Sequence, residues 1–339
     1  MRVVVVGATG NVGVRVVEAL ARREEVEEIV GVARRRPELQ VPKARFEAAD
    51  IRHADLTTLF RGADAVVHLA WMIQPGRDER VTASTNVEGS RRVIQAVIEA
   101  RVPALVYASS IGAYAPGPKS RRVDEDWPAT GIESSFYSRH KAIVERELRW
   151  RAAIHPDLRI VALRPGLIFQ RGAASEIQRL FLGPLFPSAA AHPRLVPVLP
   201  LPRGFAVQAV HTEDVAEAYA LAVTRRDVRG ALNVAAEPVL DATTLADALD
   251  ARVVTVPATL VRAAAAASFA AHLQPTEPGW IDLALNAPLM ATDRIRALGW
   301  SPRHSATDAL HELLAGIRDR AGTATAPLHP AGRRPRALV

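Results

Sequence analysis

Tyr137 and Lys141 have side chains of the types, and at the spacing, needed to move a proton to or from a bound molecule. The segment Tyr137-Ser138-Arg139-His140-Lys141 places a phenol and an ammonium at positions i and i+4, which lie on one face of a helix. A neighbouring cation favours the phenolate and lowers the pKa of a tyrosine from about 10 toward working pH. Such a tyrosine can donate or accept a proton beside a hydride-transfer site. The same spacing also arises by chance, as an exposed pair on a helix.

Two adjacent serines lie upstream of this pair, at the end of an apolar run. The run Val106-Tyr107-Ala108 leads into Ser109 and Ser110 and predicts a strand end, which is where sheets of this kind present ligands. The two side chains face opposite ways on an extended strand. The sequence does not separate their roles.

The opening of the chain has a strand, a glycine turn and a helix start in immediate succession. Glycine permits a tight turn and close approach of the backbone, while the free N–H groups and the positive dipole end of the helix favour a pyrophosphate. The strand before the turn and the amphipathic helix after it make this interpretation specific. The residues predicted to bind a dinucleotide here are Gly7, Thr9, Gly10, Asn11, Val12 and Gly13.

The second predicted strand ends in basic residues, where an NAD-preferring site normally offers an acid to the ribose 2′-hydroxyl. Arg34 and Arg35 can make charge-assisted bonds to a 2′-phosphate, so we expect NAD(P) binding with NADP(H) favoured. A solvated basic turn is the alternative. Asp50 and Ile51 are predicted to meet the adenine, although Asp50 could equally cap the next helix.

Several further motifs, taken with the glycine turn and the Tyr-Lys pair, resemble the extended short-chain dehydrogenase/reductases, the NAD-dependent epimerase/dehydratase-like family. They are His68-Leu69-Ala70, Asn86-Val87-Glu88-Gly89, Leu163-Arg164-Pro165-Gly166, Asp214-Val215-Ala216 and Leu298-Gly299-Trp300-Ser301-Pro302. The similarity extends from residue 2 to about residue 315. It implies a Rossmann-type domain of seven strands with a small C-terminal substrate lobe.

The resemblance also implies roles for single residues. Tyr137 would be the catalytic acid/base, and Lys141 would bind the nicotinamide ribose and tune Tyr137. Ser110 would hydrogen-bond the substrate oxygen, with Ser109 as its competitor. The cofactor contacts expected besides the glycine turn and the strand ends are Leu69, Ala70, Asn86, Ser109, Tyr137, Lys141 and Pro165.

The chain departs from the sugar-modifying members of that family. Dehydratases look like they need an Asp-Glu pair directly after the catalytic hydroxyl, but Ile111-Gly112 follows Ser110, so dehydration is not expected. Epimerases typically carry arginines for the diphosphate, where this chain has Val207-Gln208 and residues 286–290. A desolvated diphosphate without arginine is poorly stabilised. These departures favour a smaller, less anionic substrate.

We therefore expect an NAD(P)-dependent oxidoreductase that transfers hydride to or from a carbonyl or alcohol of a small molecule. Two alternatives stay open. A nucleotide-sugar epimerase would need arginines from irregular loops for the phosphates, namely Arg171, Arg179, Arg194 or Arg203. A non-catalytic NADP(H)-sensing regulator would keep the glycine turn, but such proteins usually lack the Tyr-Lys pair.

The elements that must position these residues alternate between apolar runs and helical periodicity, as in a parallel sheet flanked by helices. The predicted fold class is α/β, a Rossmann-type doubly wound parallel sheet with a smaller C-terminal α+β substrate lobe. Strands are predicted at 2–6, 29–33, 65–69, 104–109 and 159–163, and helices at 11–22, 84–101 and 137–154.

We place the Rossmann core at residues 1–165 and the substrate lobe at 166–320, with some segments returning to the core. Crowded prolines after residue 183 mark the change of pattern. The lobe is predicted to contain a strand near 206–210, a helix at 212–223 and alanine-rich helices between 240 and 285. Residues 321–339 are predicted to be disordered.

The composition and charge of the chain limit the kinds of partner and the location that we expect for the protein. The net charge of +7 includes three arginines and no acid in residues 321–339, so the rest carries only +4, and we expect no nucleic-acid partner. No apolar run approaches the roughly 20 residues of a membrane span, and no export signal is recognised. Cysteine is absent and the histidines lack metal-ligand spacing, so we predict a cytoplasmic protein without metal. A homodimer through the helices at 84–101 and 137–154 is an alternative to a monomer.

Overall fold

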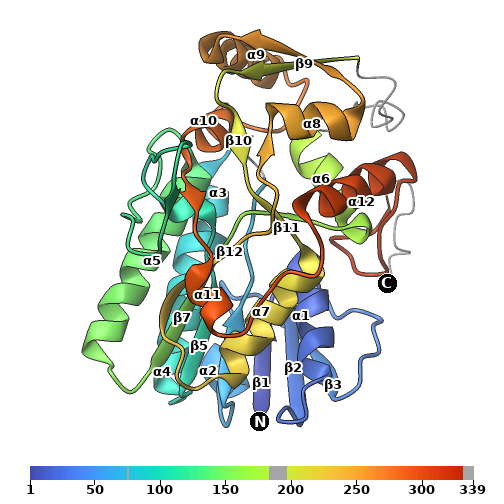
Figure 1. Ribbon diagram of the computed structural model, residues 1–339. Helices are drawn as coiled ribbons and strands as arrows, with labels where there is room; N and C mark the ends of the chain where they lie inside the picture. Colours follow the sequence, from blue (N-terminus) through green and yellow to red (C-terminus); the bar gives the residue numbers. More distant parts are fainter. Residues whose placement is uncertain (75, 183–196, 331–339) are drawn as a thin grey trace.

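The centre of the protein is a seven-stranded parallel sheet (Figure 1). The computed structural model describes residues 1–74, 76–182 and 197–330. In spatial order the strands are β12 (Gly230–Val234), β7 (Arg159–Pro165), β5 (Ala104–Ala108), β4 (Ala65–His68), β1 (Arg2–Val6), β2 (Glu28–Ala33) and β3 (Ala44–Ala48). The chain moves from β1 outward to β3 and then crosses to β4 on the other side of β1. This doubly wound arrangement confirms the predicted fold class.

Near-continuous apolar runs form the central strands, because helices cover both faces of the sheet. All residues of β7 are buried, and the five predicted strands lie within two residues of their expected ends. The sequence prediction did not include β3 and β12. In β3 the residues Arg45, Glu47 and Ala48 are at least partly exposed at the sheet edge, and β12 arrives from the second half of the chain.

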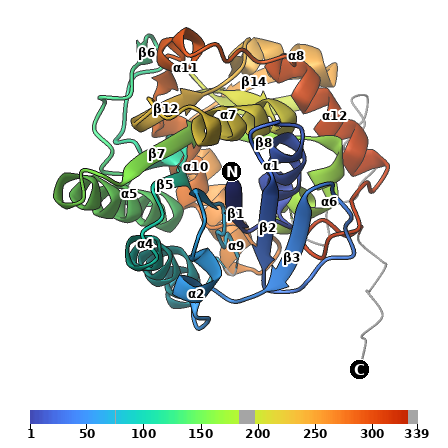
Figure 2. The same ribbon diagram turned by 90° about the horizontal axis from the view of Figure 1, so that it is seen from below.

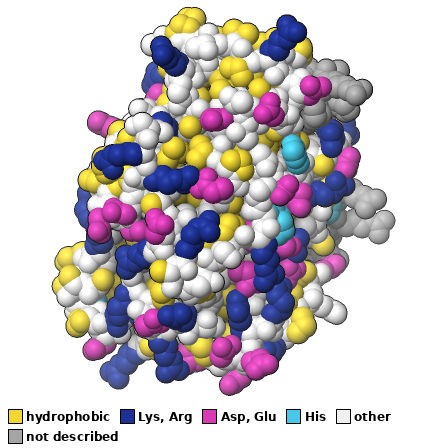
Figure 3. All heavy atoms as spheres, viewed as in Figure 1, with side chains coloured by type: hydrophobic (Ala, Val, Ile, Leu, Met, Phe, Trp, Pro, Cys, Tyr) yellow, Lys and Arg dark blue, Asp and Glu magenta, His cyan; other side chains and the backbone are white. Residues whose placement is uncertain are grey.

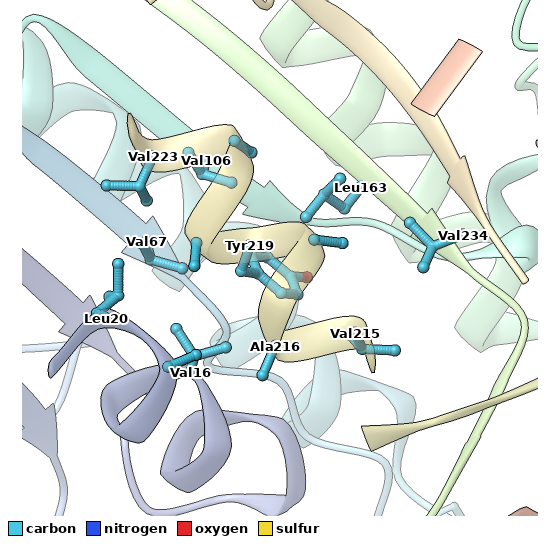
Figure 4. Packing of buried hydrophobic residues seen from close by; sticks show 14 of the residues in the cluster. Val16, Leu20, Val67, Val106, Leu163, Val215, Ala216, Tyr219, Val223 and Val234 are labelled. Carbon is cyan, nitrogen blue, oxygen red and sulfur yellow. The ribbon is translucent and has the colours of Figure 1, made fainter. Parts of the chain in front are cut away.

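Helices from both halves of the chain cover the sheet (Figure 2). Their bounds are α1 (Asn11–Ala21), α2 (Leu56–Phe60), α3 (Glu79–Ala83), α4 (Ser90–Glu99), α5 (Phe136–Ile154) and α7 (Thr212–Thr224). Helices α1 and α7 pack on one face, where Tyr219 of α7 lies among apolar side chains of α1 and the sheet (Figure 4). Helices α2, α4 and α5 pack on the other face. A π-helical turn at Ser84–Gly89 joins α3 to α4, so the helix predicted at 84–101 starts earlier, at Glu79.

The second half of the chain forms short two-stranded pairs and helices around the carboxyl end of the sheet. The pairs are β8 (Leu167–Phe169) with β11 (Ala209–His211), β10 (Ala206–Val207) with β13 (Leu240–Asp241), β9 (Val198–Pro202) with β14 (Arg252–Val256), and β6 (Arg122–Val123) with β15 (Leu289–Met290). The helices are α6 (Ala174–Ile177), α8 (Ala242–Leu249), α9 (Ala258–Ala270), α10 (Gly279–Asn286), α11 (Asp293–Ala297) and α12 (Ala306–Arg318).

The outer part of this lobe, made of β9, β14, α8 and α9, is thinly packed. Helices α8 and α9 contain no fully buried residue, and four of the five residues of β14 are exposed. Leu260 and Leu273 are 61% and 58% exposed. Figure 3 shows apolar side chains on the surface at this end of the molecule, whereas charges of both signs alternate over the sheet domain.

Residues beyond 320 continue the fold for some distance. Leu328 is buried against Val14 of α1 and Ala173, so the disorder predicted from residue 321 does not hold through residue 330. Residues 331–339 lie outside the described part of the chain. None of the described helices is long and apolar enough to cross a membrane.

Candidate active site

The first turn of α5 places Tyr137 next to the end of β5. Helix α5 begins after Ser135, whose hydroxyl accepts a hydrogen bond from the Ser138 amide at 3.4 Å. The Ser138 hydroxyl donates to the Gly112 carbonyl at 2.5 Å and ties the helix start to the turn after β5. A Cβ atom at position 112 would lie 2.9 Å from the Tyr137 ring, so glycine there permits the close approach of the ring.

Ser110, and not Ser109, faces Tyr137. The Ser110 hydroxyl and the Tyr137 ring both lie against Gly112, where a Cβ atom would be 3.4 Å from Ser110 Oγ and 2.9 Å from the ring. Ser110 is buried, and its hydroxyl accepts from the Gly112 amide at 3.0 Å. The Ser109 hydroxyl donates to the Glu145 carboxylate at 2.5 Å. This alternation is what consecutive residues in an extended backbone produce. The structure therefore separates the positions of two serines that the sequence leaves equivalent.

The electrostatic setting of Tyr137 differs from the sequence expectation. Burial raises the pKa of Tyr137 to about 12, against the opposing effect of the Ser110 hydrogen bond. The Lys141 ammonium lies 5.8 Å from the centre of the Tyr137 ring and donates to the Ala108 carbonyl at 2.6 Å. Burial lowers the pKa of Lys141 well below its usual value, and the charge of Glu145 opposes this. The expected lowering of the tyrosine pKa by Lys141 is therefore wrong for this structure.

A buried ion pair lies behind the two serines. Glu145, one helical turn beyond Lys141, is 2% exposed and binds the guanidinium of Arg164, which is 4% exposed, through both carboxylate oxygens. Burial acts to lower the pKa of Arg164, but the hydrogen bonds and charge of Glu145 raise it overall. Arg164 also donates to the Glu125 carbonyl at 2.8 Å. Sequence analysis did not identify Glu145, whose partners come from β5 and β7.

The glycine turn after β1 leaves no room for a side chain at Gly7 or Gly13. Gly7 has a φ of +90°, and a Cβ atom there would lie 2.6 Å from the Ala70 amide nitrogen. A Cβ atom at Gly13 would lie 2.1 Å from the Gly7 carbonyl oxygen. Gly10 is the N-cap of α1, and no side chain caps the first N–H groups of this helix. The close contact with Ala70 brings Leu69 and Ala70, at the end of β4, beside the turn.

The other residues of this turn have different surroundings. Thr9 is 9% exposed, and Val12 is partly buried against the core. The Asn11 side chain accepts hydrogen bonds from Gln170 at 2.7 Å and Thr212 at 3.2 Å. Asn11 therefore joins α1 to β8 and α7, and Gln170 and Thr212 are partners that sequence analysis missed.

Arg34 and Arg35 are exposed at the carboxyl end of β2, and neither forms an ion pair with a described residue. Asp50 binds Arg52 through both carboxylate oxygens, which lowers the pKa of Asp50 to about 2. Asp55, and not Asp50, caps helix α2, so the capping alternative for Asp50 is wrong.

The remaining predicted cofactor contacts lie around the carboxyl ends of the strands. The Asn86 side chain holds the backbone N–H and carbonyl of Met72 at 2.7 and 2.8 Å, and so fixes the loop after β4. Ile51 is buried beneath the π-helical turn, where a Cβ atom at Gly89 would contact it at 2.7 Å. Pro165 is the last residue of β7. The structure thus brings these positions to one edge of the sheet, and their contacts with a cofactor remain predictions.

Two groups of polar residues lie apart from Tyr137. Burial lowers the pKa of His68 to about 3, and its Nε2 lies 2.9 Å from the Ser90 hydroxyl. His211, Glu213 and His304 lie close enough for their ligand atoms to fall within 4.8 Å of one another, although sequence analysis found no metal-ligand spacing. The absence of a metal stays a prediction.

Two of the four arginines proposed for a diphosphate are engaged elsewhere. Arg171 pairs with Asp319 at 2.6 Å. Arg179 donates to backbone carbonyls near the end of the described chain. Arg203 is exposed, and Arg194 lies outside the described residues.

The strand order, the glycine turn and the Ser-Tyr-Lys set at the sheet edge define a dinucleotide-binding α/β protein of the short-chain dehydrogenase/reductase type. The chain belongs to the NAD dependent epimerase/dehydratase family, whose model matches residues 3–235. The resemblance drawn from the sequence motifs is confirmed.

Relatives cover the chain to different extents. An uncharacterised protein of Mycobacterium tuberculosis is 29% identical over 328 residues, which are 95% of this chain and 31% of that protein. The chain thus spans about a third of the length of the mycobacterial proteins it matches. Human short-chain dehydrogenase/reductase family 42E member 1 is 31% identical over 42% of this chain and 40% of its own length. A decarboxylating sterol-4-alpha-carboxylate 3-dehydrogenase of Candida albicans is 29% identical over 50% of this chain and 51% of its own.

Solved structures share the fold. The UDP-glucose 4-epimerase of Thermus thermophilus in complex with NAD has a TM-score of 0.68 and 23% identity, covering 94% of this chain and 99% of that chain. The UDP-N-acetylglucosamine 4-epimerase of Methanobrevibacter ruminantium has a TM-score of 0.69 and 17% identity, covering 94% and 98%. At these identities the likeness concerns the fold alone.

Proposed function

We propose that this protein is an NAD(P)-dependent oxidoreductase that interconverts a carbonyl and an alcohol on a small substrate, with Tyr137 as the acid/base. The observation that carries the proposal is the placement of the Tyr137 ring and the Ser110 hydroxyl together against Gly112, just beyond the carboxyl end of β5, with Lys141 one turn along α5. In doubly wound sheets, ligands bind at this edge, where the strand order reverses. The sensor alternative does not explain why these side chains converge.

The chain's own residues fit a dinucleotide. Gly7 and Gly13 allow the turn to pack closely against Ala70 and against its own backbone, and the start of α1 supplies N–H groups and a positive dipole end for a pyrophosphate. When bound, the coenzyme would supply the hydride donor or acceptor. Lys141 would then bind the ribose of the nicotinamide half with an N–H group that its bond to the Ala108 carbonyl leaves available.

Proton transfer is the part that Tyr137 performs. A phenol with a pKa of about 12 keeps its proton at neutral pH, so Tyr137 is ready to donate from its Oη to a substrate oxygen. In the reverse direction, alcohol oxidation, the Tyr137 Oη would accept the proton from the substrate oxygen. The Ser110 hydroxyl, beside Oη, would orient that same oxygen.

Replacing the acid tests this assignment. Tyr137→Phe should lower turnover by about 10²- to 10⁴-fold, the usual contribution of a positioned acid or base, while coenzyme affinity changes little. Tyr219→Phe, in the core of α7, is the matched control and should leave turnover unchanged. Measurement combines steady-state kinetics on a carbonyl panel with calorimetric titration of coenzyme. Full turnover in the Tyr137 variant would reject the proposal.

The coenzyme preference follows from Arg34 and Arg35, which are exposed and available to a 2′-phosphate. We expect the double change of Arg34 and Arg35 to Ala to weaken NADPH binding by at least about 10-fold, because two charge-assisted contacts are lost. NADH binding should not change. Arg45→Ala, on β3 and paired with Glu28, is the control. Equal losses for both coenzymes would contradict an NADP(H) preference.

A further inference from the structure

Two tryptophan rings lie against the Tyr137 ring and Phe181 packs on one of them. We propose that Trp71, Trp280 and Phe181, called here the aromatic wall, bind an uncharged, mainly apolar, ring-bearing ketone or alcohol. The Trp280 ring lies 4.7 Å from the Tyr137 ring, and the Trp71 ring lies edge-on at 5.9 Å. Phe181 packs at a right angle on Trp280, with 4.9 Å between ring centres. The inference rests on the proposed function, because it takes Tyr137 as the group that meets the substrate oxygen.

The aromatic wall is built from three distant segments that bond to one another. Gln74, from the loop that also carries Trp71, donates to the Leu180 and Pro275 carbonyls at 2.8 and 3.2 Å. The Thr276 hydroxyl donates to the Phe181 carbonyl at 2.7 Å. These bonds hold the loop after β4, the turn at residues 178–182 and the approach to α10 in one arrangement.

The approach to α10 is also packed tightly against the start of α5. A Cβ atom at Gly279 would lie 2.4 Å from the Ser134 carbonyl oxygen, so no side chain separates the two segments. Trp280 therefore reaches the Tyr137 ring directly. The close backbone contact between Gly279 and Ser134 thus fixes where Trp280 lies.

The chemistry of this wall suits a flat apolar ligand. Indole and phenyl rings offer large apolar surfaces that stack on other rings, and pockets for small molecules combine such surfaces with a few polar groups. Here the polar groups are the Tyr137 and Ser110 hydroxyls. The indole N–H of Trp71 is buried without a partner among the described residues, so it can donate to a second oxygen of the ligand.

Charges near the wall disfavour a diphosphate. Glu277 lies three residues before Trp280, and burial raises its pKa to about 7. The Lys141 ammonium lies 3.4 Å from the centre of the Trp71 ring and donates to the Ala108 carbonyl. The arginines Arg139 and Arg262 are paired with Glu79 and Asp282 at 2.7 and 2.9 Å. A diphosphate needs unpaired cations for charge-assisted bonds. The described surroundings of Trp280 therefore fit a neutral ligand better than a nucleotide sugar.

Equilibrium binding to the Tyr137→Phe variant, saturated with coenzyme, tests the inference without relying on turnover. The probes are cyclohexanone, 2-decalone and UDP-glucose, measured by calorimetry. Because 2-decalone buries more apolar surface, it should bind at least about 10-fold more tightly than cyclohexanone. UDP-glucose should bind more weakly than 2-decalone. Coenzyme binding with tight UDP-glucose and no 2-decalone binding would overturn this inference and leave the oxidoreductase proposal standing.

Variants of the wall provide a second test. Trp280→Ala should weaken 2-decalone binding by at least about 10-fold, because most of the stacked surface is lost, and Trp280→Phe should retain part of the affinity. Trp150→Ala, at a tryptophan 51% exposed on α5, is the matched control and should have no effect. Unchanged affinity in both Trp280 variants would overturn the inference. Coenzyme affinity, measured in parallel, verifies that each variant is folded, and Trp280→Phe serves if Trp280→Ala fails to fold.

Discussion

The sheet domain and the outer lobe of β9, β14, α8 and α9 bury their apolar residues to very different extents. Every residue of β7 is buried between two helical layers, whereas helices α8 and α9 have no fully buried residue. A strand covered on both faces needs apolar side chains throughout. A helix with one covered face tolerates many sequences, and the alanine-rich α9 is an example.

This difference in packing density suggests that the two regions differ in how firmly they hold their residues in place. The sheet domain holds the glycine turn and the Ser110-Tyr137 pair in fixed positions, and such positions depend on dense packing. The outer lobe has few buried contacts, which imply lower local stability. The two regions should therefore differ in rigidity. Three measurements test this contrast.

The largest expected difference concerns ion pairs. Glu145→Gln leaves the buried Arg164 without its counter-charge and should lower the free energy of unfolding by about 3–5 kcal/mol. Asp282→Asn removes the partner of Arg262, which is half exposed on α9, and should cost no more than about 1 kcal/mol. Urea denaturation of both variants measures the two values. Equal losses would mean that the sheet domain and the lobe are equally dependent on their ion pairs.

Truncation of one leucine in each region should give a smaller but parallel contrast. Leu20 of α1 is fully buried in the core, and Leu20→Ala should cost about 2–5 kcal/mol through the cavity it leaves. Leu260→Ala on α9 should change the free energy by less than about 0.5 kcal/mol, since the side chain is already 61% exposed. Thermal and urea unfolding provide the measurement. A large loss at Leu260 would indicate that another surface covers the lobe in solution.

The smallest effect is expected at the junction between the regions. The pKa of Glu277 is about 7 in the folded protein and near 4.5 in the unfolded chain. Between these two pH values the folded protein therefore holds a proton on Glu277 that the unfolded chain has lost. Stability should therefore fall as pH rises from about 4.5 to about 7. Glu277→Gln should remove about 1 kcal/mol of that fall, after allowance for solvent screening. Urea titrations of the wild-type protein and the variant at pH 5 and pH 8 give the change in unfolding free energy between the two pH values. An identical change in both proteins would contradict this assignment.

Sequence reasoning succeeded where one segment carries its own signal. Strands such as β1 are runs of buried valine, and the glycine turn follows directly, so local pattern and fold agree. The edge strand β3 escaped prediction because Arg45 and Glu47 interrupt its apolar pattern. The strand β12 begins at an exposed glycine and gains its place only by pairing with β7.

The candidate site was predictable to a similar degree. The spacing of Tyr137 and Lys141 identified the helix face, but the pKa of the tyrosine depends on burial and on where the ammonium points, which spacing does not encode. The pair of Glu145 with Arg164 joins a helix to a strand. The contacts of Trp71, Phe181 and Trp280 join three segments far apart in the chain. Such contacts arise only from tertiary packing.

The seventh strand of the sheet has a practical consequence for dividing this molecule. Residues 230–234 complete the hydrogen bonding of β7, although the chain has by then passed through β8–β11 and α7. In a fragment that ends at residue 165, β7 would be an unpaired edge strand, and strands of other molecules could pair with it and cause aggregation. Grafting a substrate lobe from a relative must therefore keep residues 212–234 with the coenzyme half.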